Sequence, residues 1–264
     1  MRVHLRHEII FRYKPPVRSI IKLVRLVPRN FEGLHIADWR IVVEADCRLR
    51  TGEDAFGNIT HSFDARGEFS HLRLRVESEI ETFDTSGILK GAAERFPPEL
   101  YLRDTVLTSA SADLRNYALE TTKKSESTLI KLHDFLAAIR ADFDWSKEEQ
   151  IQSLTAADVF SRGSGNAEGL AHVFIAGARH LEIPARFVSG YYLANETGLA
   201  HSWAEAHVER LGWVGFDPAI GACPSEMHMR LACGLDSLGA APIRGSYASP
   251  GSEKVEAQIQ LELI

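Results

Sequence analysis

The chain has 264 residues and a formal net charge of −6, and 45% of its residues are hydrophobic while 25% are charged. This balance is typical of a globular protein with one large or two modest domains, and it excludes a disordered chain. A mildly acidic protein has no electrostatic attraction to nucleic acid or to an anionic membrane, so neither is expected as a partner.

Targeting signals and cysteines point to an ordinary reducing compartment. The first residues (MRVHLRHEII) alternate charged and apolar side chains and lack the apolar segment of a secretory signal peptide. No stretch has the length of a membrane span. Three cysteines, an odd and sparse set, do not make a disulfide framework. We therefore expect a cytoplasmic protein.

Residues 1 to about 90 alternate between apolar and polar side chains, which predicts half-buried antiparallel strands. A proline-containing linker follows, and the spacing then becomes helical. We expect an N-terminal β domain over residues 1–105 and a second unit over residues 106–264. Apolar positions of the first strand include Val3, Leu5, Ile9 and Phe11.

Two apolar helices are predicted beyond the linker, with a short one between them. Residues 129–139 place their large apolar side chains on one helix face. Thr155 suits the N-cap of the short helix, which the glycine-containing loop 163–166 ends. The second apolar helix is predicted to begin near Ala167 and to stop before Pro184.

The rest of the chain reads as short strands. We predict them at residues 186–192, 202–208 and 213–216. Residues 253–264 alternate strictly, which predicts a terminal strand tied into a sheet. The predicted fold class is therefore α+β, with an antiparallel β domain followed by a core in which a helix packs on an antiparallel sheet.

Three segments of this second unit carry chemically useful residues. Residues 165–172 (GNAEGLAH) form a glycine loop that opens a helix. Residues 201–205 (HSWAE) begin with a histidine at the start of a predicted strand. Residues 212–218 (GWVGFDP) form a strand that ends at Asp217.

This placement suits thiol acyl transfer. A nucleophile at a helix N-terminus gains from the helix dipole, which favours the thiolate. A histidine on a neighbouring strand can accept and return the proton, and a carboxylate can orient it. The sequence separation of 16 between His201 and Asp217 suits two strands of one hairpin.

Further motifs follow in a fixed order, namely residues 26–29 (LVPR), 54–58 (DAFGN), 183–191 (IPARFVSGY) and 242–245 (PIRG). Together with the three segments above, they resemble the bacterial transglutaminase-like family. The resemblance implies a papain-like core and acyl transfer or hydrolysis at an amide of a peptide or protein substrate. It implies His201 as the catalytic base, Asp217 as its orienting carboxylate, and no metal or cofactor.

The sequence departs from the family pattern where the resemblance places the catalytic cysteine, because that position is Ala167. Glu168 and Gly169 replace a glutamine and an aspartate of the pattern. The alanine is either an engineered replacement or a natural loss. The chain is accordingly an acyl-transfer scaffold without its nucleophile or, alternatively, a pseudoenzyme that binds a peptide or protein in the retained groove.

Aromatic residues near these segments are candidates for substrate binding. Trp203, Tyr191 and Trp213 either line the substrate groove or belong to the core. Protease, amidase and cross-linking activities differ in which acceptor reaches the thioester, and the sequence leaves all three open.

Overall fold

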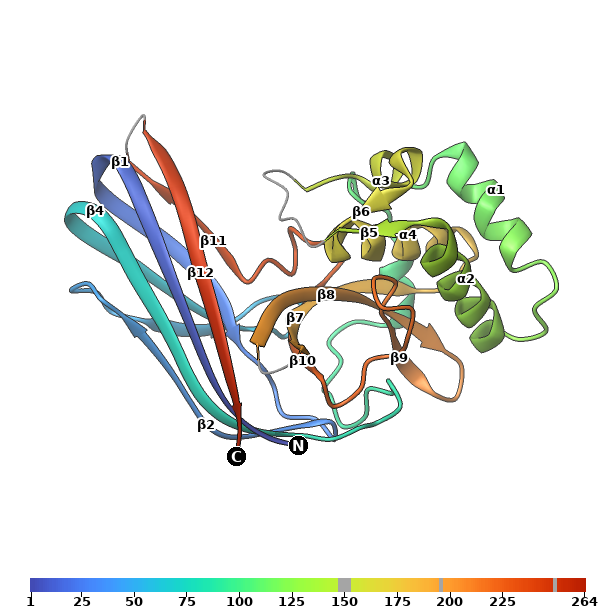
Figure 1. The fold of residues 1–264 in the computed structure, drawn as a ribbon, viewed down its shortest axis with the longest axis horizontal. Coiled ribbons are helices and arrows are strands. Elements are labelled where there is room, and N and C mark those ends of the chain that lie inside the picture. Colours follow the sequence, from blue (N-terminus) through green and yellow to red (C-terminus); the bar gives the residue numbers. More distant parts are fainter. Residues whose placement is uncertain (147–152, 195–196, 249–250) are drawn as a thin grey trace.

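A large curled antiparallel sheet, covered at one end by a group of helices, forms the body of the protein (Figure 1). The computed structural model of the chain describes residues 1–146, 153–194, 197–248 and 251–264. Ten strands belong to the large sheet, and two short strands form a second one. The predicted α+β class is confirmed.

Three long strands stand away from the helices (Figure 1). β1 (Arg2–Val27) lies between β4 (Ile59–Thr82) and β12 (Ser252–Leu263) and is antiparallel to both. Val3 pairs with Leu263, so the first and last strands of the chain are neighbours. The strand predicted over residues 253–264 is therefore confirmed.

Alternate residues of β1 and β4 face a shared apolar core, as the sequence pattern predicts, whereas on β12 only Leu261 is buried and Val255 and Leu263 are exposed. The polar residues between them on β1 point to solvent, because successive side chains of a strand point to opposite faces. Buried members of this core include Val3, Leu5, Ile9, Leu72, Leu74 and Val76.

The remaining elements follow in chain order. They are β2 (Leu34–Val43), β3 (Arg50–Glu53), a 3-10 helix (Pro98–Leu102), α1 (Ala112–Thr121), α2 (Thr128–Asp142), β5 (Asp144–Trp145), α3 (Ala156–Arg162), β6 (Ser164–Gly165), α4 (Ala167–His180), β7 (Ala185–Ala194), β8 (Thr197–Val208), β9 (Gly212–Phe216), β10 (His228–Gly234) and β11 (Ile243–Tyr247).

Helix starts agree with the capping residues of the sequence. Thr155 and Asp158 form a capping box at α3, and Gly163, with φ 65, is the C-cap that follows Arg162. Asn166 caps α4, where its Oδ1 accepts a hydrogen bond from the Gly169 N–H at 2.9 Å. α1 was not predicted, because its buried face consists of only Leu114 and Ala118.

Helix α4 is central to the second core. Nearly all of its residues are buried, and it packs against β7 and β8 with α1, α2 and α3 around it. In the described part of the chain, no helix combines the length and apolar character needed to cross a membrane.

The large sheet joins the two predicted units. β12 pairs with β1 and, through Gln260 and Thr197, with β8. Strands from residues 1–105 and from residues 106–264 thus belong to one sheet. The boundary between residues 105 and 106 stays a prediction.

Candidate active site

Ala167 is the first residue of α4 and directly follows the N-cap residue Asn166. Residues 164–165 pair as a short parallel strand with β5, which fixes the path of the chain into the helix. The first N–H groups of a helix lack helical partners and carry partial positive charge. Position 167 therefore lies where a negative charge is stabilised.

His201 and Asp217 lie together, as the sequence predicts. His201 lies within β8, which begins at Thr197 and so starts earlier than predicted, and Asp217 directly follows β9. β8 and β9 are antiparallel neighbours, so the chain between His201 and Asp217 folds back as a hairpin. His201 Nε2 is 2.6 Å from Asp217 Oδ2, and both side chains are buried.

The Asp217 carboxylate is held on both oxygens. Its Oδ1 accepts hydrogen bonds from the Ala219 N–H at 3.0 Å and from the Ile220 N–H at 3.3 Å. Because Asp217 turns the chain immediately after β9, these donors come from its own turn. The carboxylate is thereby oriented independently of the histidine that it contacts.

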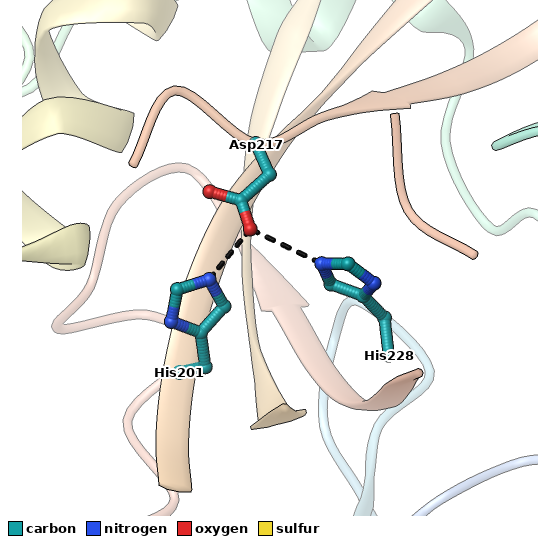
Figure 2. A group of neighbouring side chains, drawn as sticks. All are labelled: His201, Asp217 and His228. Atoms are coloured by element: carbon teal, nitrogen blue, oxygen red, sulfur yellow. Dashed lines mark hydrogen bonds and ion pairs between the residues drawn. The ribbon is translucent and has the colours of Figure 1, made fainter. Parts of the chain in front are cut away.

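A second histidine, His228, also reaches Asp217 (Figure 2). Its Nε2 is 3.1 Å from Oδ2, the same oxygen that His201 contacts. His228 is the first residue of β10, which pairs with β7 and not with β8 or β9. The sequence pattern does not identify this contact, because it depends on the order of strands in the sheet.

The pKa of the Asp217 carboxyl lies below its ordinary value. Burial alone would raise this pKa, since the charged form loses its hydration. Hydrogen bonds from the His201 and His228 rings act in the opposite direction and outweigh burial. Asp217 is therefore ionised and accepts hydrogen bonds from both rings.

A cleft of about 430 Å³ separates the start of α4 from β8. Ala167 and His201 both line it, together with Asn166 and Glu168. The Trp145 ring lies near His201, with 6.4 Å between ring centroids. Because the helix N-terminus and His201 open into one cleft, a bound group can reach both.

Glu168 is the single charged side chain that lines the cleft among the described residues. Its Oε1 is buried and has no hydrogen-bond partner in the structure. An unpartnered buried acceptor carries a desolvation cost that a bound donor can relieve.

The three aromatic candidates for substrate binding do not line this cleft. Tyr191 is buried and its hydroxyl is 2.8 Å from His7 Nδ1. Trp213 is buried under the Arg186 guanidinium, 3.9 Å from the ring centroid. Trp203 is also buried and makes a T-shaped contact with the His228 ring, with 5.3 Å between ring centroids. Of their two possible roles, the structure supports the core role.

His172, one helical turn after Glu168, is a packing histidine. Its Nε2 accepts a hydrogen bond from the Ser237 N–H at 3.2 Å, so its Nδ1 carries the proton and donates to the Leu154 carbonyl at 3.1 Å. Burial lowers the pKa of His172, and the nearby Glu168 charge opposes that effect only in part. Neither nitrogen remains for chemistry.

His201, Asp217 and His228 also have the composition of a metal site, with ligand atoms within 4.8 Å of one another. The hydrogen bonds do not fit that role. The Ser225 N–H donates to His228 Nδ1 at 3.1 Å, so the neutral ring carries its proton on Nε2. A protonated Nε2 has no lone pair to offer a cation, so His228 does not present this nitrogen as a metal ligand.

Comparisons with known proteins agree with this architecture. A family model described as the Transglutaminase-like superfamily matches residues 115–218. A model described as the bacterial transglutaminase-like N-terminal region matches residues 3–81. His201, Asp217 and Ala167 all lie inside the first match.

Two of the matches extend over nearly the whole chain. The chain is 22% identical to the uncharacterized protein ML0607 of Mycobacterium leprae strain TN, covering 98% of each chain. Its fold matches a crystal structure from Cytophaga hutchinsonii, provisionally described as a cysteine protease, with a TM-score of 0.80. That match covers 99% of this chain and 90% of the other at 18% identity, so it shows a shared fold.

Proposed function

We propose that this chain, which belongs to the transglutaminase-like superfamily, keeps the family's thiol acyl-transfer scaffold but carries Ala167 in place of the nucleophile. Its ligand is an amide-bearing peptide or protein held in the cleft between α4 and β8. The observation that carries the proposal is the joint placement of Ala167 and the Asp217-bound His201 on one cleft.

The roles follow from the chemistry of the scaffold. A cysteine at position 167 would pass its proton to His201, and its sulfur would attack the amide carbon. The tetrahedral intermediate would collapse to a thioester as His201 returns the proton to the leaving amine. Water or a second amine would then attack the thioester and release the thiol. Asp217 orients the imidazole throughout.

Alanine removes the first of these steps. Its methyl group has no lone pair, so no covalent bond to the amide carbon forms and no leaving amine is expelled. The cleft, the helix N-terminus and the His201–Asp217 pair remain available for binding. As it stands, the chain is therefore a binding protein built on a hydrolase scaffold.

The test is to restore the thiol. Ala167→Cys, incubated with a mixture of peptides and isopeptides, should form an acyl-enzyme that intact-mass spectrometry detects as an adduct on the peptide containing position 167. The double variant Ala167→Cys, His201→Ala is the control and should form none. Absence of any adduct or turnover with Ala167→Cys would contradict the acyl-transfer scaffold. The codon at position 167 in the native gene distinguishes engineered replacement from natural loss.

A second candidate function is peptide binding alone, in a scaffold that a cysteine at position 167 does not make catalytic. The unpartnered Oε1 of Glu168 favours it, because a ligand donor would satisfy that oxygen. Peptide binding by the unmodified chain, lost on Glu168→Ala, together with an inert Ala167→Cys variant, would support this reading.

A further inference from the structure

Two imidazoles converge on one carboxylate oxygen (Figure 2). His201 Nε2 lies 2.6 Å and His228 Nε2 lies 3.1 Å from Asp217 Oδ2. In Figure 2 the rings approach the oxygen from different sides. Oδ2 therefore accepts hydrogen bonds from two rings, and its negative charge stabilises both of them and not His201 alone.

The protonation of His228 follows from its other nitrogen. A backbone N–H can only donate, so the Ser225 N–H requires a lone pair on His228 Nδ1, 3.1 Å away. The His228 N–H in turn donates to the Ser225 carbonyl at 3.0 Å, which closes a tight turn around this contact. A doubly protonated ring would place two hydrogens between Nδ1 and the Ser225 nitrogen. His228 is thus a neutral ring whose single proton points at Asp217.

The hydrogen bond between His228 and Asp217 is buried away from solvent. The side chains of His228 and Asp217 are 4% and 0% exposed, so solvent does not compete for the shared oxygen. The Tyr192 ring contacts both imidazoles, with centroids 4.9 Å from His228 and 5.4 Å from His201. In such surroundings a hydrogen bond to an ionised group is strong.

We infer that His228 is a positioning residue that orients the Asp217 carboxylate by a hydrogen bond to Oδ2. This second hydrogen bond reduces the negative charge that Oδ2 offers to His201, and so lowers the proton affinity of the His201 ring. The inference rests on the proposed function only in assigning His201 as the proton carrier. A second donor on the shared oxygen withdraws negative charge from the hydrogen bond that stabilises the imidazolium at His201. His201 thereby gives up its proton more readily to a leaving group.

The other charged groups near the two histidines do not account for a change in the proton affinity of His201. Glu168 lines the same cleft as His201 from α4, and Glu205 and Arg230 line the cavity beside His228. Glu205 is engaged by two arginines, so its charge is compensated. Groups facing the two histidines from packed elements are Asp217, Trp145, Tyr192, Trp203 and Glu168.

The experiment is a pH titration of the unmodified chain and two His228 variants by nitrogen-15 NMR of the histidine rings. His228→Gln keeps an N–H donor near the position of Nε2, whereas His228→Phe keeps the ring volume and removes the donor. We expect His201 in His228→Phe to bind its second proton about tenfold more tightly than in the unmodified chain. His228→Gln should restore most of the original titration.

Each outcome decides the inference. An unchanged or weakened proton affinity of His201 in His228→Phe would overturn it, as would equal shifts in the two variants, which indicate a purely structural role. If His228→Phe does not fold, the unmodified chain still decides, because a spectrum with the proton of His228 on Nδ1 overturns the assignment. None of these readouts needs a nucleophile, so an inert Ala167→Cys variant would contradict the proposed function and leave this result standing.

Discussion

Arg186 and Glu205 face each other across β7 and β8 and form an ion pair of 2.6 Å that is almost completely buried. Arg230 reaches the other oxygen of Glu205 at 2.7 Å, and Glu94 binds the outer edge of Arg186. Buried charges are tolerated only when every one of them is paired. This network holds the strands that carry the candidate active site.

Glu205→Gln should lower the free energy of unfolding by about 3 kcal/mol, because two buried arginines lose their shared counter-ion. Denaturant unfolding monitored by circular dichroism measures it. Glu94→Gln is the matched control, since its side chain is one-third exposed, and it should cost at most about 1 kcal/mol. Equal effects of the two variants would show that burial does not determine the strength of this network.

The same network predicts an acid-dependent loss of stability. Burial would raise the pKa of Glu205, but Arg230 and Arg186 outweigh it and lower the pKa to about 2. A depressed folded-state pKa contributes stability that is present above the ordinary glutamate range and disappears as pH falls toward 2, on the order of 3 kcal/mol in total. Unfolding free energies measured from pH 6 to pH 2 should show this slope, and Glu205→Gln should reduce it. An unchanged slope in that variant would assign the acid sensitivity to other carboxylates.

A cysteine placed at position 167 should be a reactive thiol. The start of α4 and the nearby His201 both favour its thiolate, so iodoacetamide should label it at about pH 6 at least roughly tenfold faster than the native cysteines. Burial raises the pKa of Cys223, and burial with the charges of Asp46 and Asp64 raises that of Cys47, so both serve as slow internal controls. Mass spectrometry of the labelled peptides gives the ratio. Adding His201→Ala should bring the rate down to that of an ordinary cysteine, and a rate insensitive to His201 would argue against their pairing.

The Asn166 cap should contribute to both stability and the cleft. Asn166→Ala removes the acceptor of the Gly169 N–H and should cost about 1 kcal/mol of unfolding free energy. Asn166→Asp keeps a capping oxygen and adds a favourable charge at the helix N-terminus, so it should be close to neutral. Thermal unfolding of the two variants measures the difference, and comparable losses would mean that the cap is not what stabilises this turn.

Local signals in the sequence determined much of the fold. The Thr155 cap and the loop before Ala167 located the starts of α3 and α4, because capping depends on residues within one turn. Strict alternation located the last strand, since successive side chains of a strand point to opposite faces. The His201–Asp217 contact was also predictable, because it arises within a single hairpin.

Only the tertiary structure decided which distant residues join the site. His228 reaches Asp217 because β10 pairs with β7, on the opposite side from β8, and strand order leaves no local mark in the sequence. The burial of Trp203 and Trp213 was equally open, because an aromatic residue suits a core as well as a groove until the elements covering it are in place. The sequence alone therefore determined several elements, though not α1, and the contact inside one hairpin. Packing between non-consecutive strands determined the second histidine and the lining of the cleft, since it depends on contacts far apart along the chain.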